Sequence, residues 1–193
     1  MKMATIITDK TLDAKGLACP MPIVKTKKEI DTLEPGQVLE IQATDKGSTA
    51  DIAAWAKNTG HQYLGTIEAG DILKHYLRKA DPSETKEETA HPHTVTIDEL
   101  QQKIDGDEKV TVLDVREPAE YAFGHIPGAK SIPLAELEKR FEELEKDEDI
   151  HIVCRSGRRS DLAAQQLAEK GYTTKNVLGG MQEWKGSQAN LNH

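Results

Sequence analysis

The stretch that decides the fold is Ile-Val-Cys-Arg-Ser-Gly-Arg-Arg-Ser at positions 152–160. An apolar strand segment runs into Cys154, a short loop rich in glycine and arginine follows, and a helical pattern comes next. A loop between the carboxyl end of a strand and the amino end of a helix aims backbone N–H groups and the positive end of the helix dipole at one point. Such a point suits an anionic thiolate or persulfide, and cysteine is a nucleophile only when ionised. We therefore interpret Cys154 as a reactive cysteine, with Arg158 and Arg159 adding positive charge around it.

The second cysteine of the chain, Cys19, also lies at a predicted helix start. The segment 11–22, Thr-Leu-Asp-Ala-Lys-Gly-Leu-Ala-Cys-Pro-Met-Pro, ends a strand-like stretch and opens a helix with two prolines. Proline is tolerated in the first helical turn. We therefore expect the sulfur of Cys19 to face the positive end of a helix, as Cys154 does. Lone cysteines are more often small buried apolar residues, but two cysteines at helix starts favour a functional interpretation of both.

Length and composition limit the class of protein. The chain has 193 residues, of which 37% are hydrophobic and 30% charged, as in ordinary globular proteins. A net charge of −8 disfavours sequence-independent binding to nucleic acid. No apolar run is long enough to span a bilayer, and residues 1–9 lack the apolar core of a signal peptide. We expect a cytoplasmic protein without membrane or direct nucleic-acid contact, whose two cysteines stay reduced.

The first part of the chain, residues 4–80, has the element order β-α-β-α-β-β. A strand-like segment over 5–12 precedes a predicted helix over 22–33, which stops at Glu-Pro-Gly. Residues 38–43 alternate as a strand, and a helix through position 59 begins near Ser48 and closes at Gly60. Residues 63–67 and 72–78 are typical of a β-hairpin.

The next segment, residues 81–92, is polar and acidic, with prolines near its ends and no periodic apolar residue. This composition predicts a flexible linker that could extend to roughly 40 Å. The pair His91 and His93 lacks further ligands, so we expect no metal site there.

The remaining residues, 93–188, alternate strands with helices. Strands are expected near 95–97, 110–115, 130–133, 150–153 and 176–178, and helices from 98, over 117–123, over 135–144 and over 160–170. This order predicts a doubly wound parallel sheet, whose ligands gather at the carboxyl ends of strands, where Cys154 lies.

Four motifs make the second part similar to the rhodanese family over about 94–186. They are Leu-Asp-Val-Arg-Glu at 113–117 with Glu-Tyr at 120–121, Gly-His-Ile-Pro-Gly-Ala at 124–129, the loop 154–160, and Gly-Gly-Met-Gln-Glu-Trp at 179–184. The resemblance implies a sulfurtransferase without a cofactor. In such an enzyme Cys154 takes the outer sulfur of thiosulfate or a persulfide, holds it as a persulfide, and yields it to a thiol or cyanide. The loop differs from the Cys-x5-Arg loop of cysteine phosphatases, because Ser160 occupies the sixth position after Cys154.

The residues around Cys154 divide into binding and support. We expect the loop backbone to cradle the persulfide and the arginine side chains to recognise anionic donors, with Arg159 bracing the loop as an alternative. The predicted substrate-binding residues are Arg155, Ser156, Gly157, Arg158 and Arg159. We expect supporting roles for three charged residues that pair with one another, Asp114, Arg116 and Glu120. His125 is expected to hold a turn.

The first part resembles the TusA/SirA-like sulfur carriers over about 7–79. The residues that carry the resemblance are the segment 12–22 with its Cys-Pro-x-Pro motif, the Pro-Gly stop at 35–36, and Asp45. The resemblance implies a two-layer α/β sandwich and a Cys19 that receives sulfane sulfur as a persulfide and passes it on. Ala14 and Lys15 depart from the residues that many relatives carry, which leaves the choice of partner open.

Together the two resemblances predict a persulfide relay, in which Cys154 takes sulfur from a small donor and Cys19 accepts or forwards it. Partners would be small sulfur donors, thiol acceptors, and a cysteine desulfurase or thiolation enzyme. An alternative from the binding class is a sulfur-carrier or redox adaptor with little turnover of its own. The sequence leaves the donor, the final acceptor and the oligomeric state open.

Overall fold

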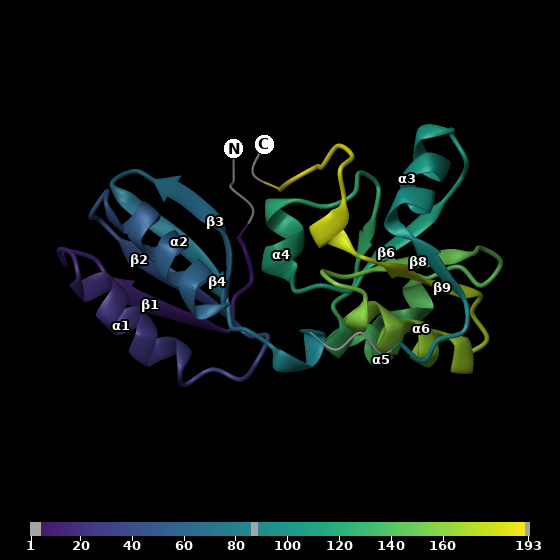
Figure 1. Ribbon diagram of the computed structural model, residues 1–193, viewed down its shortest axis with the longest axis horizontal. Helices are drawn as coiled ribbons and strands as arrows, with labels where there is room; N and C mark the ends of the chain where they lie inside the picture. Colours follow the sequence, from purple (N-terminus) through teal and green to yellow (C-terminus); the bar gives the residue numbers. More distant parts are fainter. Residues whose placement is uncertain (1–4, 86–88, 192–193) are drawn as a thin grey trace. The chain divides into compact units, whose positions relative to one another are not determined.

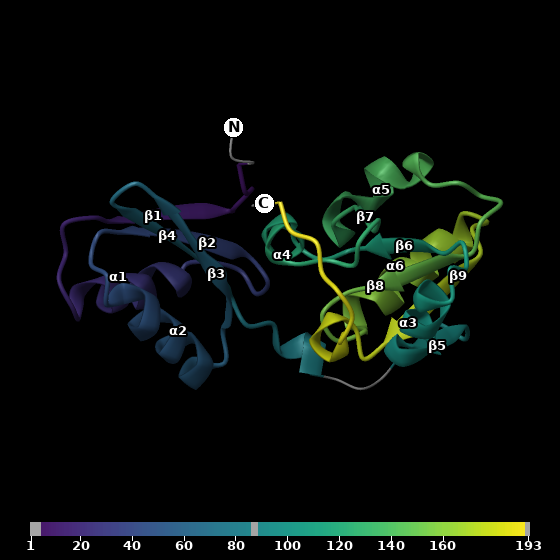
Figure 2. The ribbon, with the colours of Figure 1, turned by 90° about the horizontal axis from the view of Figure 1, so that it is seen from above.

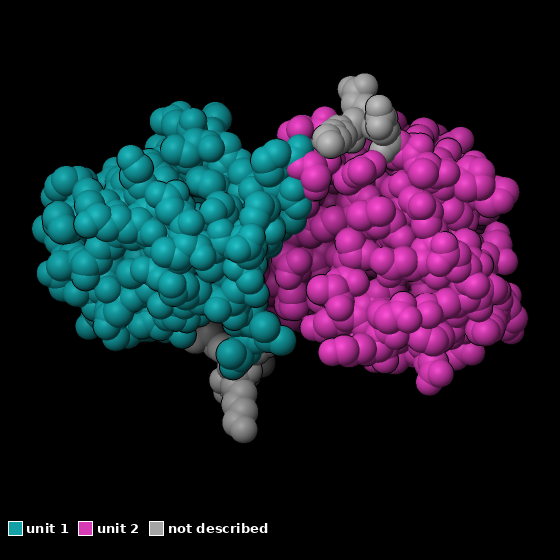
Figure 3. All heavy atoms as spheres, turned by 90° about the horizontal axis from the view of Figure 1, so that it is seen from below, with its two compact units in different colours: residues 1–82 teal, residues 83–193 magenta. Residues whose placement is uncertain are grey.

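The computed structural model describes residues 5–85 and 89–191. The chain divides into two compact units, residues 1–82 and 83–193 (Figure 3). Within the described ranges, no helix is long and apolar enough to cross a membrane.

The first unit is a four-stranded sheet with both helices on one face (Figure 2). Its elements are β1 (Lys10–Ala14), α1 (Met21–Ile30), β2 (Val38–Ala43), α2 (Ser48–Thr59), β3 (Gln62–Ala69) and β4 (Ile72–Arg78). The strand order is β1-β2-β4-β3, with β1 parallel to β2 and the other pairs antiparallel. The predicted β-α-β-α-β-β order and two-layer architecture are confirmed.

Side chains from both layers of this unit make its core. Leu39 and Ile41 of β2 pack with Ile30 of α1 and Ile52 of α2, and all four are fully buried. The alternation of β2 and the helical spacing of α1 and α2 both direct these apolar side chains between the layers. The layers therefore fix where the loop before α1, which carries Cys19, leaves the sheet.

The second unit is a five-stranded, all-parallel sheet with helices on both faces (Figure 1). Its strands are β5 (Thr94–Thr96), β6 (Thr111–Asp114), β7 (Lys130–Ser131), β8 (Ile150–Val153) and β9 (Thr174–Leu178), in the order β5-β9-β8-β6-β7. Its helices are α3 (Ile97–Asp105), α4 (Pro118–Phe123), α5 (Leu137–Arg140) and α6 (Arg158–Glu169), with 3-10 turns at Leu134–Glu136, Phe141–Glu143 and Met181–Glu183. The predicted doubly wound sheet is confirmed.

Two apolar clusters cover the two faces of this sheet. Ile150 and Ile152 pack with Leu167 of α6 on one face, while Val153 packs with Leu100 of α3 on the other. Strand β8 is buried at every position, as a central parallel strand must be. Its carboxyl end, where Cys154 follows, therefore lies at the middle of the sheet.

The helix predicted over 135–144 is wrong. That segment forms a 3-10 turn, the four-residue α5 and a second 3-10 turn. The carbonyl of Phe141 accepts hydrogen bonds from the Tyr172 hydroxyl at 3.0 Å and from the amide of Leu144 at 3.1 Å. Hydrogen bonds to the rest of the unit, such as that of Tyr172, take the place of some hydrogen bonds of a continuous helix. The apolar side chains whose spacing predicts a helix still pack against the core.

The segment expected to be a linker, 81–92, carries ordered contacts in its described residues. Residues Pro82–Thr85 form a 3-10 turn, and the amides of Ala90 and His91 donate to the carboxylate of Asp161 in α6 at 2.9–3.1 Å. Residues 86–88 of the expected linker lie outside the described residues.

Candidate functional site

Cys154 lies between the end of β8 and the start of α6, as the sequence predicts. Gly157 has a φ of 103°, a left-handed conformation that turns the chain from the loop into the helix. The Gly157 amide then donates to Sγ of Cys154 at 3.1 Å. The helix start thus places a backbone N–H against the sulfur, where it stabilises negative charge.

A buried hydrogen-bond chain holds the other side of the sulfur. Oγ of Ser160 lies 3.3 Å from Sγ of Cys154, and it donates to Oδ1 of Asn176 at 2.6 Å. The Asn176 amide group in turn donates to the carbonyl of Gly157 at 3.2 Å. Because the Ser160 proton is directed at Asn176, the Ser160 oxygen is left to accept from the Cys154 thiol.

The loop after β9 closes against the backbone of the cysteine loop. The amide of Met181 donates to the carbonyl of Cys154 at 2.7 Å, and that of Gln182 donates to the carbonyl of Arg155 at 3.1 Å. A Cβ on Gly180 would meet these two carbonyl oxygens at 2.5 and 2.6 Å. Only glycine fits this close approach.

The arginines of the loop have different environments. Arg155 and Arg158 are half-buried, whereas Arg159 is 7% exposed. The guanidinium of Arg159 donates to both oxygens of Glu120 at 2.7 and 3.1 Å, and its Nε lies 3.0 Å from Oε1 of Glu84. Burial lowers the pKa of Arg159, but the carboxylates of Glu120 and Glu84 outweigh burial and raise it. Arg159 therefore stays charged between two carboxylates.

The support residues expected around the loop form two separate groups. Asp114 is fully buried and accepts from the backbone amide and the guanidinium of Arg116 at 2.7–3.1 Å, while Arg116 also donates to the carbonyl of Gly124. His125 stacks on Tyr121 with ring centroids 3.6 Å apart and donates from Nδ1 to the Tyr121 carbonyl. Glu120, grouped with Asp114 and Arg116 by sequence, pairs with Arg159 instead.

Cys19 is exposed at the entrance to α1, two residues before the helix begins. A hydrogen bond to Asp51, with desolvation and the charges of Asp51 and Asp45, raises the pKa of the Cys19 thiol. Asp51 lies in the first turn of α2 and Asp45 in the loop before it. At neutral pH this setting favours the thiol over the thiolate.

The expected electropositive setting is therefore wrong for Cys19. Pro20 and Pro22 have no N–H to offer, and the Met21 amide donates to the carbonyl of Ala18 at 3.0 Å. The two prolines that start the helix thus remove the donors that would have faced the sulfur. Carboxylates from a distant part of the sequence take their place.

A buried polar chain runs behind the start of α2. Ser48 donates to the carbonyl of Asp45 at 2.6 Å, so Nε2 of His75, 2.9 Å from Ser48 Oγ, is the donor of that contact. Nδ1 of His75 lies 2.7 Å from Oγ1 of Thr66 and accepts from it. Burial lowers the pKa of His75 to about 4, which fits this neutral, fully paired imidazole. The chain helps to hold the loop that carries Asp45.

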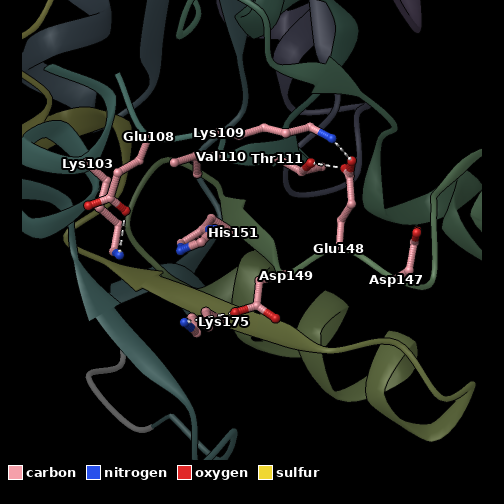
Figure 4. A pocket seen from close by; sticks show the side chains of 10 residues that line it. All are labelled: Lys103, Glu108, Lys109, Val110, Thr111, Asp147, Glu148, Asp149, His151 and Lys175. Carbon is pink, nitrogen blue, oxygen red and sulfur yellow. Dashed lines mark hydrogen bonds and ion pairs between the residues drawn. The ribbon is translucent and has the colours of Figure 1, made fainter. Parts of the chain in front are cut away.

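A hollow of about 340 Å³ lies at the amino ends of β6, β8 and β9 (Figure 4). Paired lysines and carboxylates rim it, with buried His151 among its lining residues. Neither cysteine lines it, and the parallel sheet puts Cys154 at the opposite edge. Among residues 5–85 and 89–191, no group of three or more His, Cys, Asp or Glu is arranged to hold a metal ion.

Some residues of the site were not assigned a role from the sequence. Ser160 and Asn176 orient Cys154 and its loop, Glu84 contacts Arg159, and Asp51 raises the pKa of Cys19. Asp51 follows Cys19 by 32 positions in the sequence, and no spacing rule connects the two. Ser160 alone has a local signal, its position in the first turn of α6 directly after the loop.

Two family models match the chain, one in each unit. The model described as sulfurtransferase TusA matches residues 10–79, and the model described as rhodanese-like domain matches residues 96–187. The first match contains Cys19 and the second contains Cys154.

Individual relatives are similar to the whole chain or to one part of it. A Bacillus subtilis protein named "Putative sulfur carrier protein YrkF" is 52% identical over 96% of this chain and 98% of its own length. The sulfur carrier protein TusA of Allochromatium vinosum is 42% identical over 37% of this chain and 95% of its own. A crystal structure of a rhodanese-like domain protein from Staphylococcus aureus aligns with 51% of this chain and 97% of its own, at 34% identity and a TM-score of 0.49.

Proposed function

Because this chain belongs to the family that joins a TusA-type sulfur carrier domain to a rhodanese-like domain, we propose that it is a sulfurtransferase with two persulfide-carrying cysteines. Cys154 takes sulfane sulfur from a donor such as thiosulfate or a low-molecular-weight persulfide. Cys19 accepts that sulfur or forwards it to another thiol. The observation that carries the proposal is the Gly157 amide aimed at Sγ of Cys154 from the start of α6.

In the first half-reaction, the Cys154 thiolate attacks the outer sulfur of thiosulfate. A new S–S bond forms, the S–S bond of thiosulfate breaks with its electron pair, and sulfite leaves. The negative charge of the resulting Cys154 persulfide rests beside the Gly157 amide, which already donates to the sulfur at 3.1 Å. The half-buried Arg155 and Arg158 support recognition of the anionic donor. Arg159, held between Glu84 and Glu120, braces the loop.

In the second half-reaction, a thiolate attacks the terminal sulfur of the persulfide and the Cys154 thiolate leaves. When the acceptor is Cys19, its thiol must first lose a proton. The Asp51 carboxylate, hydrogen-bonded to that thiol, is placed to take the proton as the new S–S bond forms. Sulfur moves without any net oxidation or reduction, so no cofactor is needed.

We further propose a cytoplasmic setting, since both cysteines are free and thiols remain reduced there. The exposed Cys19 suits exchange with a protein partner, of which a cysteine desulfurase or a thiolation enzyme is the chemical class that fits. We assign supporting roles to Asp114, Arg116 and His125, since their side chains hydrogen-bond to other groups of the protein.

The experiment that tests the proposal compares the intact chain with Cys154→Ser and Cys19→Ser variants. Thiosulfate:cyanide transfer should vanish in Cys154→Ser and persist in Cys19→Ser. Mass spectrometry after incubation with thiosulfate should find a +32 Da adduct, roughly the mass of one sulfur, on Cys19 only when Cys154 is intact. Full activity of Cys154→Ser would refute the enzyme assignment, and loading of Cys19 in that variant would refute the relay.

A second candidate function is a sulfur-carrier or redox adaptor with little turnover. The burial of Cys154, which is 1% exposed, favours it because slow access by a donor limits turnover. Stoichiometric persulfide loading on both cysteines, with a steady-state rate near background and tight binding to a protein partner, would support the adaptor over the enzyme.

A further inference from the structure

The chain segment that leads into the second unit contributes a carboxylate to the Cys154 loop. Glu84 lies in the 3-10 turn Pro82–Thr85, ahead of the first strand of the sheet, and is 9% exposed. Its Oε1 lies 3.0 Å from Nε of Arg159, and its backbone carbonyl accepts from Oγ of Ser156 at 3.3 Å. Glu84 therefore contacts two residues of the loop, one through its charge and one through its backbone.

The chain also contacts α6 after residues 86–88, through Ala90 and His91. Asp161, in the first turn of α6, accepts hydrogen bonds from the amides of Ala90 and His91 at 2.9–3.1 Å. The segment is thus fastened at Glu84 to the loop and at Ala90 to the helix that follows the loop. The contacts of Glu84 itself, with Arg159 and with Ser156, place its carboxylate beside the loop.

The two carboxylates on Arg159 do different work. The two carboxylate oxygens of Glu120 each accept a hydrogen bond from the guanidinium, and this bidentate contact fixes the orientation of Arg159. Glu84 faces Nε at ion-pair distance without a hydrogen bond to that nitrogen. If the Glu84 charge is removed, Glu120 still holds Arg159 in its orientation. The net charge near Cys154 then becomes more positive.

Resting on the proposed function, we infer that Glu84 is a positioning residue of the Cys154 site, which offsets part of the Arg159 charge and thereby limits how strongly an anionic sulfur is held there. A thiolate that is stabilised further becomes less nucleophilic, and a persulfide held more tightly is yielded more slowly. Glu84 thus keeps the sulfur reactive. The same contact makes the reactivity of Cys154 depend on a segment outside the rhodanese-like match at 96–187.

The test measures how readily Cys154 is alkylated as a function of pH. The full chain with Cys19→Ser, so that Cys154 is its one thiol, is treated with iodoacetamide between pH 5 and 9, and the midpoint of the rate profile is compared with that of the same chain carrying Glu84→Gln. Glutamine keeps the size and the backbone carbonyl of residue 84 and removes its charge. We expect the midpoint to fall by about half a pH unit or more, because the positive field on the thiolate is less compensated.

Two further variants make the result specific. Glu84→Asp keeps the charge and should return the midpoint to that of the parent chain, which a purely space-filling role would not predict. Glu169→Gln removes the same charge from the exposed last turn of α6 and should leave the midpoint unchanged. Thermal unfolding, followed by the fluorescence of Trp184 in chains with Trp55→Phe, confirms that the second unit of each variant is folded.

An unchanged midpoint in folded Glu84→Gln, or a midpoint moved to higher pH, overturns the inference. Alkylation needs no sulfur donor, so this outcome would leave the proposed function standing. Conversely, absence of sulfur transfer in the intact chain, with the expected shift in Glu84→Gln, would count against the function and not against the role of Glu84.

Discussion

Replacing Gly180 by alanine tests how closely the loop after β9 must approach the cysteine loop. Gly180 has a φ of 59°, and an added Cβ would lie 2.5 Å from the carbonyl oxygen of Cys154 and 2.6 Å from that of Arg155. With a ψ of −163°, Gly180 lies in a region of φ and ψ that essentially only glycine occupies, and a residue with a Cβ is strained there by roughly 1–3 kcal/mol. The backbone must also shift to remove the two close contacts, and this shift costs about a further 1–3 kcal/mol, as overpacking does in cores. We expect Gly180→Ala to lower the free energy of unfolding of the second unit by about 2–6 kcal/mol.

The matched control for this substitution is Gly128→Ala. Gly128 has a φ of 82° and nothing within 4 Å of the added Cβ, so it carries the cost of a positive φ without the contacts. Urea unfolding, followed by Trp184 fluorescence in a chain with Trp55→Phe, measures both variants. Equal destabilisation by the two substitutions would refute the reasoning, because the whole loss would then come from φ.

The same pair of variants bears on the chemistry. Relief of the contacts in Gly180→Ala moves the backbone of Cys154, whose carbonyl accepts from Met181 at 2.7 Å. Because positioning errors of this kind are costly in catalysis, sulfur transfer should drop by about tenfold or more, while Gly128→Ala keeps most of its rate. Equal rates for the two variants would show that the loop tolerates the shift.

Asp51→Asn removes the main cause of the raised pKa of Cys19, so in a chain whose other cysteine is replaced the alkylation rate at pH 8 should increase several-fold. The pKa of His75 is lowered to about 4 in the folded state, so its contribution to stability is fully present above pH 6.5 and is lost as the pH falls through 4. The first unit should lose up to about 3 kcal/mol over that window, and His75→Gln should flatten the profile measured by urea unfolding. Asp114→Asn breaks a buried ion pair and should destabilise the second unit by about 3–5 kcal/mol, whereas Arg140→Gln, on the surface, should cost less than about 1 kcal/mol in the same assay.

Each of these three predictions has an outcome that contradicts it. For Cys19 the control is Asp71→Asn, in the turn between β3 and β4, and an equal rise in rate there would indicate a general effect of charge. For His75, an unfolding free energy of the first unit that is constant from pH 7 to pH 4.5 would contradict the assigned neutral imidazole. For Asp114, a loss no larger than that of Arg140→Gln would mean that burial adds little to the strength of the pair.

Local sequence was enough to predict most elements and the position of Cys154. Strand β2 is found over the predicted residues 38–43, because alternation along a strand depends on neighbouring residues alone. The helix after Gly157 was likewise visible from its apolar spacing and its glycine. Where spacing was ambiguous it misled, as in the segment 135–144, whose apolar residues suit a helix but whose carbonyls are used by contacts elsewhere in the unit.

The sequence by itself determined which two sulfur atoms stand at strand-to-helix turns, since a turn, its prolines and its glycines are written in consecutive residues. Only the tertiary structure decided what surrounds each sulfur. Asn176 reaches the loop through the pairing of β8 with β9, Glu84 reaches Arg159 across 75 positions of chain, and Asp51 reaches Cys19 because α1 and α2 share one face of a sheet. Charge at a reactive atom is summed over all neighbours in space, and neighbours in space are set by strand order and helix packing, which no local pattern specifies.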